Sequence, residues 1–306
     1  MKILLKLRAV TRNLLFVVNP KAGKRKKKSF QEVLNQHFPS NLTKQVVMWE
    51  PIEKFQEITQ LIHSGQFTDV IAVGGDGTVN RVAVEAMKAS VRFGIVPMGS
   101  GNGLARSLGL PMDTAAALQA IATGREQYID AGMAGYEVFF CTAGVGFDAH
   151  IGERFASSRE RGLWSYVKII INELFAYTPE RYSLQFNGMT LPVEAFLVTA
   201  ANAGQYGNDF FIAPKASMQD GLIHVVVMKR FPPLAVFGLL IKILQRKADQ
   251  SKYIDTYTTD KLLIIRDHSG PMHYDGEPGN AGRSIKFEIK PKALKVIVGA
   301  AFKATT

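Results

Sequence analysis

Cysteine and long apolar segments are both scarce in this 306-residue chain. Cys141 is the only cysteine, so no disulfide can form within the chain, and we expect a small buried apolar group in a reducing compartment. The longest apolar segment, residues 231–241, contains prolines and is shorter than the roughly 20 residues that a membrane-spanning helix needs. The N-terminus mixes basic with apolar residues and lacks a continuous hydrophobic segment, so we expect no signal peptide.

Acidic residues are outnumbered: the chain has 26 aspartates and glutamates against 37 lysines and arginines, a net charge of +11. A basic chain suits an anionic partner such as a nucleotide, a nucleic acid or an acidic membrane surface. The sequence contains no recognisable nucleic-acid-binding module, so we expect no nucleic-acid partner. The densest basic cluster, residues 24–28, fits either a solvated helix start or a contact with lipid or nucleotide.

A glycine-rich segment connects a predicted strand to a predicted helix. Residues 69–73 form a short β-branched apolar run typical of a buried parallel strand, and apolar residues recur at helical spacing from Val79 onward. Because Gly74, Gly75 and Gly77 carry no Cβ, the backbone N–H groups at the helix N-terminus can approach a phosphate closely. The segment therefore predicts an anion site.

Asp76 and Thr78 indicate phosphate chemistry rather than phosphate docking alone. Thr78 can cap the helix or donate its hydroxyl to a phosphate oxygen. A carboxylate beside a phosphate is repelled by it, so Asp76 needs a metal ion, a hydroxyl proton or a water network as its partner.

Two further polar loops follow predicted parallel strands. The strand at residues 14–18 leads into the turn 19–23, and the strand at 93–96 leads into the loop 97–103. Open parallel sheets bind ligands beyond the carboxyl ends of their strands, so the three glycine-bearing loops should meet at one edge. The chain has no Walker A motif. We predict an α/β domain with an open parallel sheet and a nucleotide site at that edge.

The pattern changes near residue 130, and we predict two domains, residues 1–130 and 131–298, with a tail at 299–306 that can pack back on the first. Asn187-Gly188 is a strong hairpin signal, and short strands surround it, so the second domain should be an antiparallel β-sandwich. The predicted strands are residues 128–133, 137–143, 181–186, 191–200, 222–228, 256–258, 262–266, 284–289 and 294–298. Two apolar helices with basic flanks, 163–177 and 233–247, either pack over a sheet or form a rim that admits acyl chains from a membrane.

Three motifs in this order resemble the diacylglycerol-kinase catalytic-domain family: Gly-Gly-Asp-Gly-Thr at 74–78, Pro-Met-Gly-Ser-Gly-Asn at 97–102 and Asp-Gly-Glu at 275–277. That family includes bacterial soluble lipid kinases and the sphingosine and ceramide kinases, and it is distantly similar to NAD kinases and phosphofructokinases. The resemblance implies an NAD-kinase-like first domain, a lipid-substrate second domain, and an ATP- and Mg²⁺-dependent kinase for a lipid hydroxyl such as that of diacylglycerol. Such an enzyme would serve phospholipid biosynthesis in the cytoplasm, with peripheral association at an anionic membrane surface. Assembly into a homodimer is a further possibility that the sequence does not decide.

The resemblance also implies roles for individual residues. Nucleotide-binding residues are implied on the three loops and on the helix after residue 78: Asn19, Lys21, Gly23, Gly74, Gly75, Asp76, Gly77, Thr78, Asn80, Ser100 and Asn102. A magnesium ion is implied at an Asp-Gly-Leu turn, with oxygen ligands from Ser217, Asp220 and Leu222. A plain Asp-Gly turn is the alternative at that position.

Two carboxylates compete for the role of general base. In the bacterial lipid kinases that the chain resembles, the Glu of Asp-Gly-Glu accepts the proton, which implies Glu277 here, with Asp76 orienting magnesium, water or the acceptor hydroxyl. In the sphingosine-kinase branch the loop aspartate is favoured, so the reverse assignment stays open. Without the resemblance, residues 275–277 would be interpreted as a hairpin turn with exposed acids. Asp148, in a segment similar to one that lines the family's interdomain cleft, is a further candidate.

One departure from the family leaves the acceptor open. Bacterial diacylglycerol kinases commonly carry an aspartate where this chain has Gly103, and the Gly-Ser-Gly-Asn form is more similar to the sphingosine-kinase branch. A sphingoid base or another lipid alcohol is therefore an alternative acceptor. An NAD kinase and a non-catalytic anionic-lipid-binding protein are the alternatives from other classes.

Overall fold

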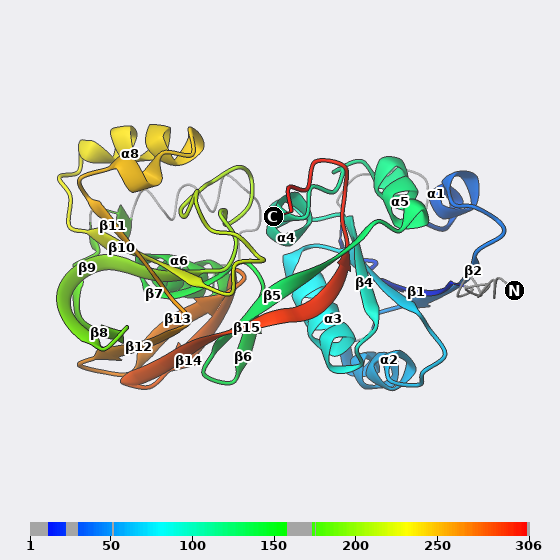
Figure 1. The fold of residues 1–306 in the computed structure, drawn as a ribbon, viewed down its shortest axis with the longest axis horizontal. Coiled ribbons are helices and arrows are strands. Elements are labelled where there is room, and N and C mark those ends of the chain that lie inside the picture. The colour runs from blue at the N-terminus through cyan, green and yellow to red at the C-terminus, as the bar shows by residue number, and fades with distance from the viewer. Residues whose placement is uncertain (1–11, 23–29, 51, 158–172, 175, 305–306) are drawn as a thin grey trace, which may run out of the picture.

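The computed structural model describes residues 12–22, 30–50, 52–157, 173–174 and 176–304, which form an α/β domain followed by an antiparallel β domain (Figure 1). This confirms the predicted fold class. The basic cluster at 24–28 and most of the helix predicted at 163–177 lie outside the described residues. Within the described ranges, no helix is long and apolar enough to cross a membrane.

Four parallel strands form the sheet of the first domain in the order β2-β1-β3-β4. Their bounds are β1 (Asn13–Val18), β2 (Thr43–Met48), β3 (Asp69–Gly74) and β4 (Arg92–Pro97). The helices are α1 (Phe30–His37), α2 (Phe55–Ile62), α3 (Asp76–Lys88), α4 (Gly103–Ser107) and α5 (Thr114–Thr123), with a 3-10 turn at Ile52–Lys54. All of β3 is buried because α1 and α5 cover one face of the sheet and α2 and α3 the other (Figure 1).

The second domain consists mainly of antiparallel strands around its own apolar core. Its hairpin from β8 (Glu180–Phe186) to β9 (Met189–Ala201) turns through Asn187 and Gly188, whose φ values of 49° and 73° are the two positive values that a type I′ turn requires. The predicted hairpin is thereby confirmed. The other strands are β5 (Glu126–Ala134), β6 (Glu137–Phe139), β7 (Thr142–Gly146), β10 (Ile223–Lys229), β11 (Ile254–Thr259), β12 (Lys261–Arg266), β13 (Gly270–Tyr274), β14 (Glu277–Ala281) and β15 (Ser284–Ile297). The helices are α6 (Phe147–Ser157) and α8 (Ala235–Leu244), with a 3-10 turn at Ala248–Gln250.

The structure corrects several predicted elements of this domain. The segments 284–289 and 294–298 form the single strand β15, with a register shift in its pairing to β5. The predicted strand 137–143 is divided between β6 and β7. The predicted elements lack α6, and they lack the strands β13 and β14, whose prolines and glycines lower strand propensity.

β5 and β15 form a two-stranded ribbon that both domains share (Figure 1). The first part of β15 pairs with β12 of the β domain, whereas Val296 near its end pairs in parallel with Phe93 of β4. After the strand, the N–H of Gly299 donates to the carbonyl of Leu108 at 3.0 Å, so the following segment lies on the first domain. The boundary proposed at residue 130 falls inside β5, and no loop marks it.

Candidate active site

Two glycine loops are in direct contact at the carboxyl edge of the parallel sheet. The first glycine loop (residues 74–78) joins β3 to α3, and the second glycine loop (residues 97–103) joins β4 to α4. A Cβ on Gly99 would lie 2.7 Å from the Cα of Gly75, closer than such atoms can pack. Glycine at these positions therefore lets the two loops touch.

Asp76 joins the two glycine loops through its carboxylate. Its Oδ2 accepts the backbone N–H of Asn102 at 2.9 Å, and its Oδ1 accepts that of Gly103 at 2.8 Å. Asn102 has a φ of 52°, and its side-chain amide makes two hydrogen bonds with the backbone of Gly99. In this structure, the partner that Asp76 requires is thus the backbone of the second glycine loop.

The turn after β1 contacts the first glycine loop through Asn19, whose Nδ2 donates to Oγ1 of Thr78 at 2.9 Å. Lys21 points elsewhere, because its Nζ pairs with Glu50 at 3.0 Å on the surface. Ser100 is exposed on the second glycine loop, and Gly23 lies outside the described residues. The structure thus brings Asn19 and Thr78 together and leaves the ammonium group of Lys21 at the surface.

The Asp-Gly-Glu motif forms the turn of the β13–β14 hairpin, with a φ of 48° at Asp275. The carboxylate of Asp275 accepts three backbone N–H groups at 2.7–3.1 Å, those of Phe140, Cys141 and Thr142. Residues 275–277 therefore do lie at a hairpin turn, but Asp275 is not an exposed acid. These bonds hold the turn against the segment between β6 and β7.

Asn80 faces this hairpin rather than the first glycine loop. Its Nδ2 donates to Oδ2 of Asp275 at 2.9 Å and to the carbonyl of Val138 at 3.1 Å. Both hydrogens of the amide are therefore engaged between α3 and the β domain. The resemblance implies nucleotide binding for Asn80, whereas its contacts here hold the hairpin that carries Glu277.

Glu277 reaches the amino end of α3 from that hairpin. A Cβ on Gly77 would collide with the Glu277 carboxylate, so the carboxylate lies directly against the first glycine loop. The first-turn N–H groups of a helix have no acceptor within the helix, which makes the start of α3 suitable for an anion. Glu277 and Asp76, the two carboxylates singled out in the sequence, thus lie at the same end of α3 and come from different domains.

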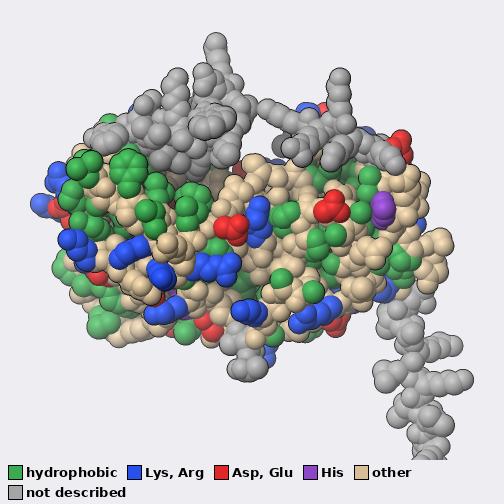
Figure 2. All heavy atoms as spheres, turned by 90° about the horizontal axis from the view of Figure 1, so that it is seen from above, with side chains coloured by type: hydrophobic (Ala, Val, Ile, Leu, Met, Phe, Trp, Pro, Cys, Tyr) green, Lys and Arg blue, Asp and Glu red, His purple; other side chains and the backbone are tan. Residues whose placement is uncertain are grey.

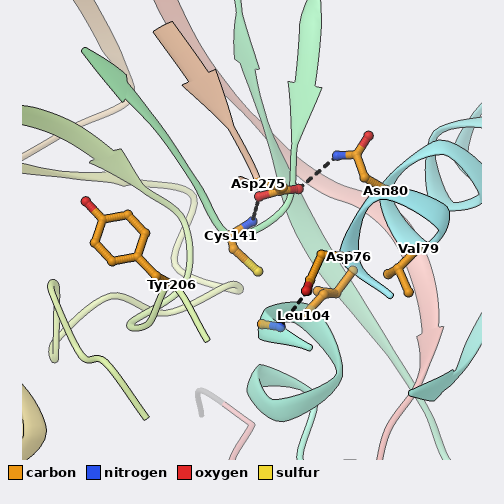
Figure 3. A pocket seen from close by; sticks show the side chains of 8 residues that line it. Asp76, Val79, Asn80, Leu104, Cys141, Tyr206 and Asp275 are labelled. Carbon is orange, nitrogen blue, oxygen red and sulfur yellow. Dashed lines mark hydrogen bonds between the residues drawn. The ribbon is translucent and has the colours of Figure 1, made fainter. Parts of the chain in front are cut away.

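A cavity of ≈ 10 Å³, about the space of one water molecule, lies beside Asp76 and Asp275 (Figure 3). The cavity is lined by both domains, through Asp76, Val79, Asn80, Gly103, Leu104, Cys141, Tyr206 and Asp275. Burial raises the pKa of the Cys141 thiol well above its usual range, and the carboxylates of Asp275 and Asp76 raise it further. The thiol is therefore uncharged at neutral pH, and its predicted burial is confirmed.

Asp148 lies in a buried polar cluster that sequence reasoning found only in part. Its Oδ2 accepts from Nε2 of His273 at 2.8 Å and from the hydroxyls of Tyr206 at 2.9 Å and Thr199 at 3.0 Å. Burial raises the pKa of Asp148, but the charge and hydrogen bond of His273 outweigh it and hold that pKa below its ordinary value. The sequence signal for His273 is its place two residues before Asp275.

The turn predicted to hold magnesium uses its one carboxylate in other ways. Oδ1 of Asp220 accepts the N–H of Leu222 at 3.0 Å, and Oδ2 pairs with Nε2 of His224 at 2.9 Å. The hydroxyl of Ser217 accepts the N–H of Gln219 at 3.2 Å. In the part of the chain that the structure describes, no three His, Cys, Asp or Glu side chains are grouped to hold a metal. The Asp220 carboxylate therefore pairs with His224 here, and the magnesium site of Ser217, Asp220 and Leu222 stays a prediction.

The fold and these contacts are those of a protein that transfers phosphoryl groups. Glycine loops that end parallel strands, faced by a glutamate from a second domain, suit transfer of a phosphoryl group, which depends on positioning and charge neutralisation.

Comparison with known proteins gives the family. Residues 13–134 match the diacylglycerol kinase catalytic domain, and residues 141–298 match the YegS C-terminal NAD kinase beta sandwich-like domain. A probable lipid kinase YegS-like of Chromohalobacter salexigens is 29% identical over 68% of this chain and 69% of its own length. A protein of the same name from Klebsiella pneumoniae is 26% identical over 81% of this chain and 84% of its own.

The crystal structure of a diacylglycerol kinase from Bacillus anthracis shares the fold, with a TM-score of 0.73 at 17% identity, over 95% of this chain and 98% of that one. The chain belongs to the diacylglycerol-kinase family, in the branch with a YegS-type C-terminal domain, and it is a lipid kinase. The predicted family is thereby confirmed.

Proposed function

We propose that this enzyme transfers the γ-phosphoryl group of ATP to the hydroxyl of a lipid such as diacylglycerol. The observation that carries the proposal is the contact of the Glu277 carboxylate with Gly77. It brings a potential proton acceptor to the helix end where phosphate groups are expected to bind.

The nucleotide phosphates would lie on the first glycine loop and the start of α3. Asn19, through Thr78, and Asp76, through the second glycine loop, fix the shape of this surface. Magnesium bound with the nucleotide would neutralise charge on the phosphate oxygens. A further magnesium ion, with oxygen ligands from Ser217, Asp220 and Leu222, is part of the proposal, at a turn where the Asp220 carboxylate also pairs with His224.

Glu277 is the proposed general base, and Asp76 is a positioning residue. Both oxygens of Asp76 accept backbone N–H groups and hold the two glycine loops together. Glu277 is half-buried on a hairpin that Asp275 holds in place. The acceptor hydroxyl would donate its proton to Glu277 as its oxygen forms the bond to phosphorus.

Gly103, where bacterial diacylglycerol kinases commonly carry an aspartate, lies against the loop that carries Tyr206. A Cβ at this position would lie 2.7 Å from the carbonyl oxygen of Tyr206. Glycine at this position therefore accommodates the close approach of the loop that carries Tyr206.

An assay with radiolabelled ATP and a panel of lipid alcohols tests the proposal. Diacylglycerol, sphingosine, ceramide and NAD are offered at equal concentration, and labelled products are separated. We expect label on diacylglycerol. Label on a sphingoid base would show that this lipid, not diacylglycerol, is the acceptor, and label on NAD would show that the enzyme is an NAD kinase. Binding of anionic lipid without any labelled product would favour the non-catalytic alternative.

A further inference from the structure

α8 presents an apolar stripe to solvent instead of burying it. The helix lies on the outside of the β domain (Figure 1) and buries Leu239 and Ile243 against its core. Leu240 is 38% exposed, and four other large side chains are more than half exposed, which we call the α8 surface: Leu234 (83% exposed), Phe237 (66%), Ile241 (54%) and Leu244 (52%). Their spacing of three, four and three residues places them on one face of the helix. Exposed apolar patches of this kind mark an interaction site.

The charged residues in the sequence segment that contains α8 are all basic. Residues 229–247 contain five lysines and arginines and no aspartate or glutamate. Lys229 pairs with Asp255 at 3.0 Å, whereas Arg230 and Lys247 are exposed. Figure 2 shows this side of the molecule, with apolar side chains gathered over the β domain and Lys and Arg side chains at their border.

We propose that the α8 surface docks the enzyme on an anionic lipid bilayer. An apolar stripe bordered by basic residues enters the boundary between headgroups and acyl chains, while the basic groups contact the anionic headgroups. A second copy of the chain fits less well, since a symmetric contact would bring two basic borders together. The proposal rests on the proposed function, because the bilayer is the source of the lipid acceptor.

The α8 surface is connected to the candidate active site by the loop after β9. The guanidinium of Arg246, just beyond α8, lies 4.1 Å from the ring centre of Phe211 in that loop. The same loop reaches the second glycine loop, where the N–H of Asn208 donates to the carbonyl of Gly101 at 3.4 Å. The end of α8 is therefore linked through this loop to the second glycine loop.

Vesicle co-sedimentation of the full chain, without ATP, tests the docking surface. The vesicles are phosphatidylcholine alone or mixed with phosphatidylglycerol. We expect Phe237→Ser/Ile241→Ser to weaken partition onto the mixed vesicles by roughly tenfold or more, because two exposed apolar side chains no longer insert. The matched control is Tyr136→Ser/Met189→Ser, which removes two exposed apolar side chains elsewhere on the β domain and should bind as the wild type does.

The basic border is tested separately. Each of Arg230→Gln and Lys247→Gln should weaken binding to anionic vesicles by about fivefold, with no change on neutral vesicles. Added salt should reduce this difference, because the Debye length is only ~8 Å at physiological ionic strength.

Three results would overturn the proposal. One is wild-type binding by Phe237→Ser/Ile241→Ser, and another is an equal loss in the control variant. The third is a wild-type dimer that becomes a monomer in the apolar variant, with no vesicle binding by either, which would assign the α8 surface to a second copy. Phosphorylation of dispersed short-chain diacylglycerol, which needs no bilayer, distinguishes failure of the docking proposal from failure of the proposed function. If only the docking proposal fails, this substrate is still phosphorylated. If only the proposed function fails, the substrate is not phosphorylated, although the chain still binds vesicles.

Discussion

Glu277 and Asp76 lie at the same end of α3 but are held differently. Glu277→Gln removes the proposed proton acceptor and keeps the shape of the side chain. We expect normal ATP affinity and a turnover that falls by roughly 10²–10⁴-fold, the usual contribution of a positioned base.

Asp76→Asn places an amide N–H₂ where an oxygen accepts a backbone N–H, so it should loosen the second glycine loop and weaken ATP binding.

Turnover and calorimetric nucleotide affinity, measured separately, distinguish these two effects. Glu57→Gln, an exposed glutamate of α2, is the control and should match the wild type. If Glu277→Gln turned over normally while Asp76→Asn bound ATP and magnesium normally without turnover, the loop aspartate would be the base.

The space beside Gly77 is occupied by the Glu277 carboxylate, so a side chain there would meet Glu277 as well as any bound phosphate. A side chain at Gly77 was expected to obstruct phosphate, but its Cβ points at the Glu277 carboxylate. Gly77→Ala should therefore displace Glu277 and lower turnover by roughly 10- to 100-fold, the effect of a misplaced catalytic group. ATP affinity should change less.

A double-variant cycle checks this reasoning. Gly77→Ala should cost no further turnover in the Glu277→Gln background, because the group that it displaces is already inactive. Gly238→Ala in α8, where a Cβ has open space, is the control. Additive losses in the double variant would show that Gly77 acts independently of Glu277.

At the scale of elements, the β13–β14 hairpin connects the two domains at the candidate active site. Asn80→Ala removes the side-chain donor to Asp275 that comes from α3. We expect the free energy of unfolding to fall by about 1.5–3 kcal/mol, the range for a hydrogen bond to a charged group. Turnover should fall roughly tenfold with unchanged ATP affinity, because Glu277 shares the hairpin.

Denaturant unfolding, turnover and ATP calorimetry are the measurements for Asn80→Ala. The control is Asn35→Ala, whose exposed amide oxygen accepts a hydrogen bond from Gln31 within α1. A loss of ATP affinity with unchanged stability would restore Asn80 to the nucleotide site that the family resemblance implies.

At the scale of the whole molecule, Asp69 connects three parts of the first domain. Its buried carboxylate pairs with Arg12 at 2.9 Å and with Arg92 at 2.6 Å, and Arg12 also donates to the carbonyl groups at the end of α5. Burial raises the pKa of Asp69, but the hydrogen bonds from Arg92 and Arg12 outweigh it and leave that pKa below its ordinary value.

A lowered pKa gives stability that is present above the unfolded-state pKa of about 3.9 and is lost as pH falls through the lower folded-state value. Asp69→Asn should therefore reduce the free energy of unfolding by about 3–5 kcal/mol at pH 7, because two guanidinium groups lose their partner. The difference from the wild type should shrink below about pH 4. Thermal unfolding as a function of pH measures both effects, and a difference that stayed constant into acid would contradict the assignment.

Local sequence patterns alone determined much of this protein. The apolar run at 69–73 and the glycines after it specify a buried strand, a tight turn and a helix start, and the structure has β3 and α3 there. Asn187-Gly188 specifies its own hairpin, because only the positive φ values of those two residues close it. Such features are predictable because they depend on residues a few positions apart.

Only the tertiary structure decided which distant residues meet. Asp76 was expected to need a metal, a proton or water, yet backbone N–H groups 26 and 27 residues away satisfy it. Asp275 reads as an exposed turn residue, yet it accepts N–H groups from residues more than 130 positions away. Packing of whole elements creates these contacts, and so does the outward face of α8, whose apolar sequence would equally suit a buried helix. Periodicity reports how apolar a helix is, but the neighbours that the fold supplies decide which of its faces is covered.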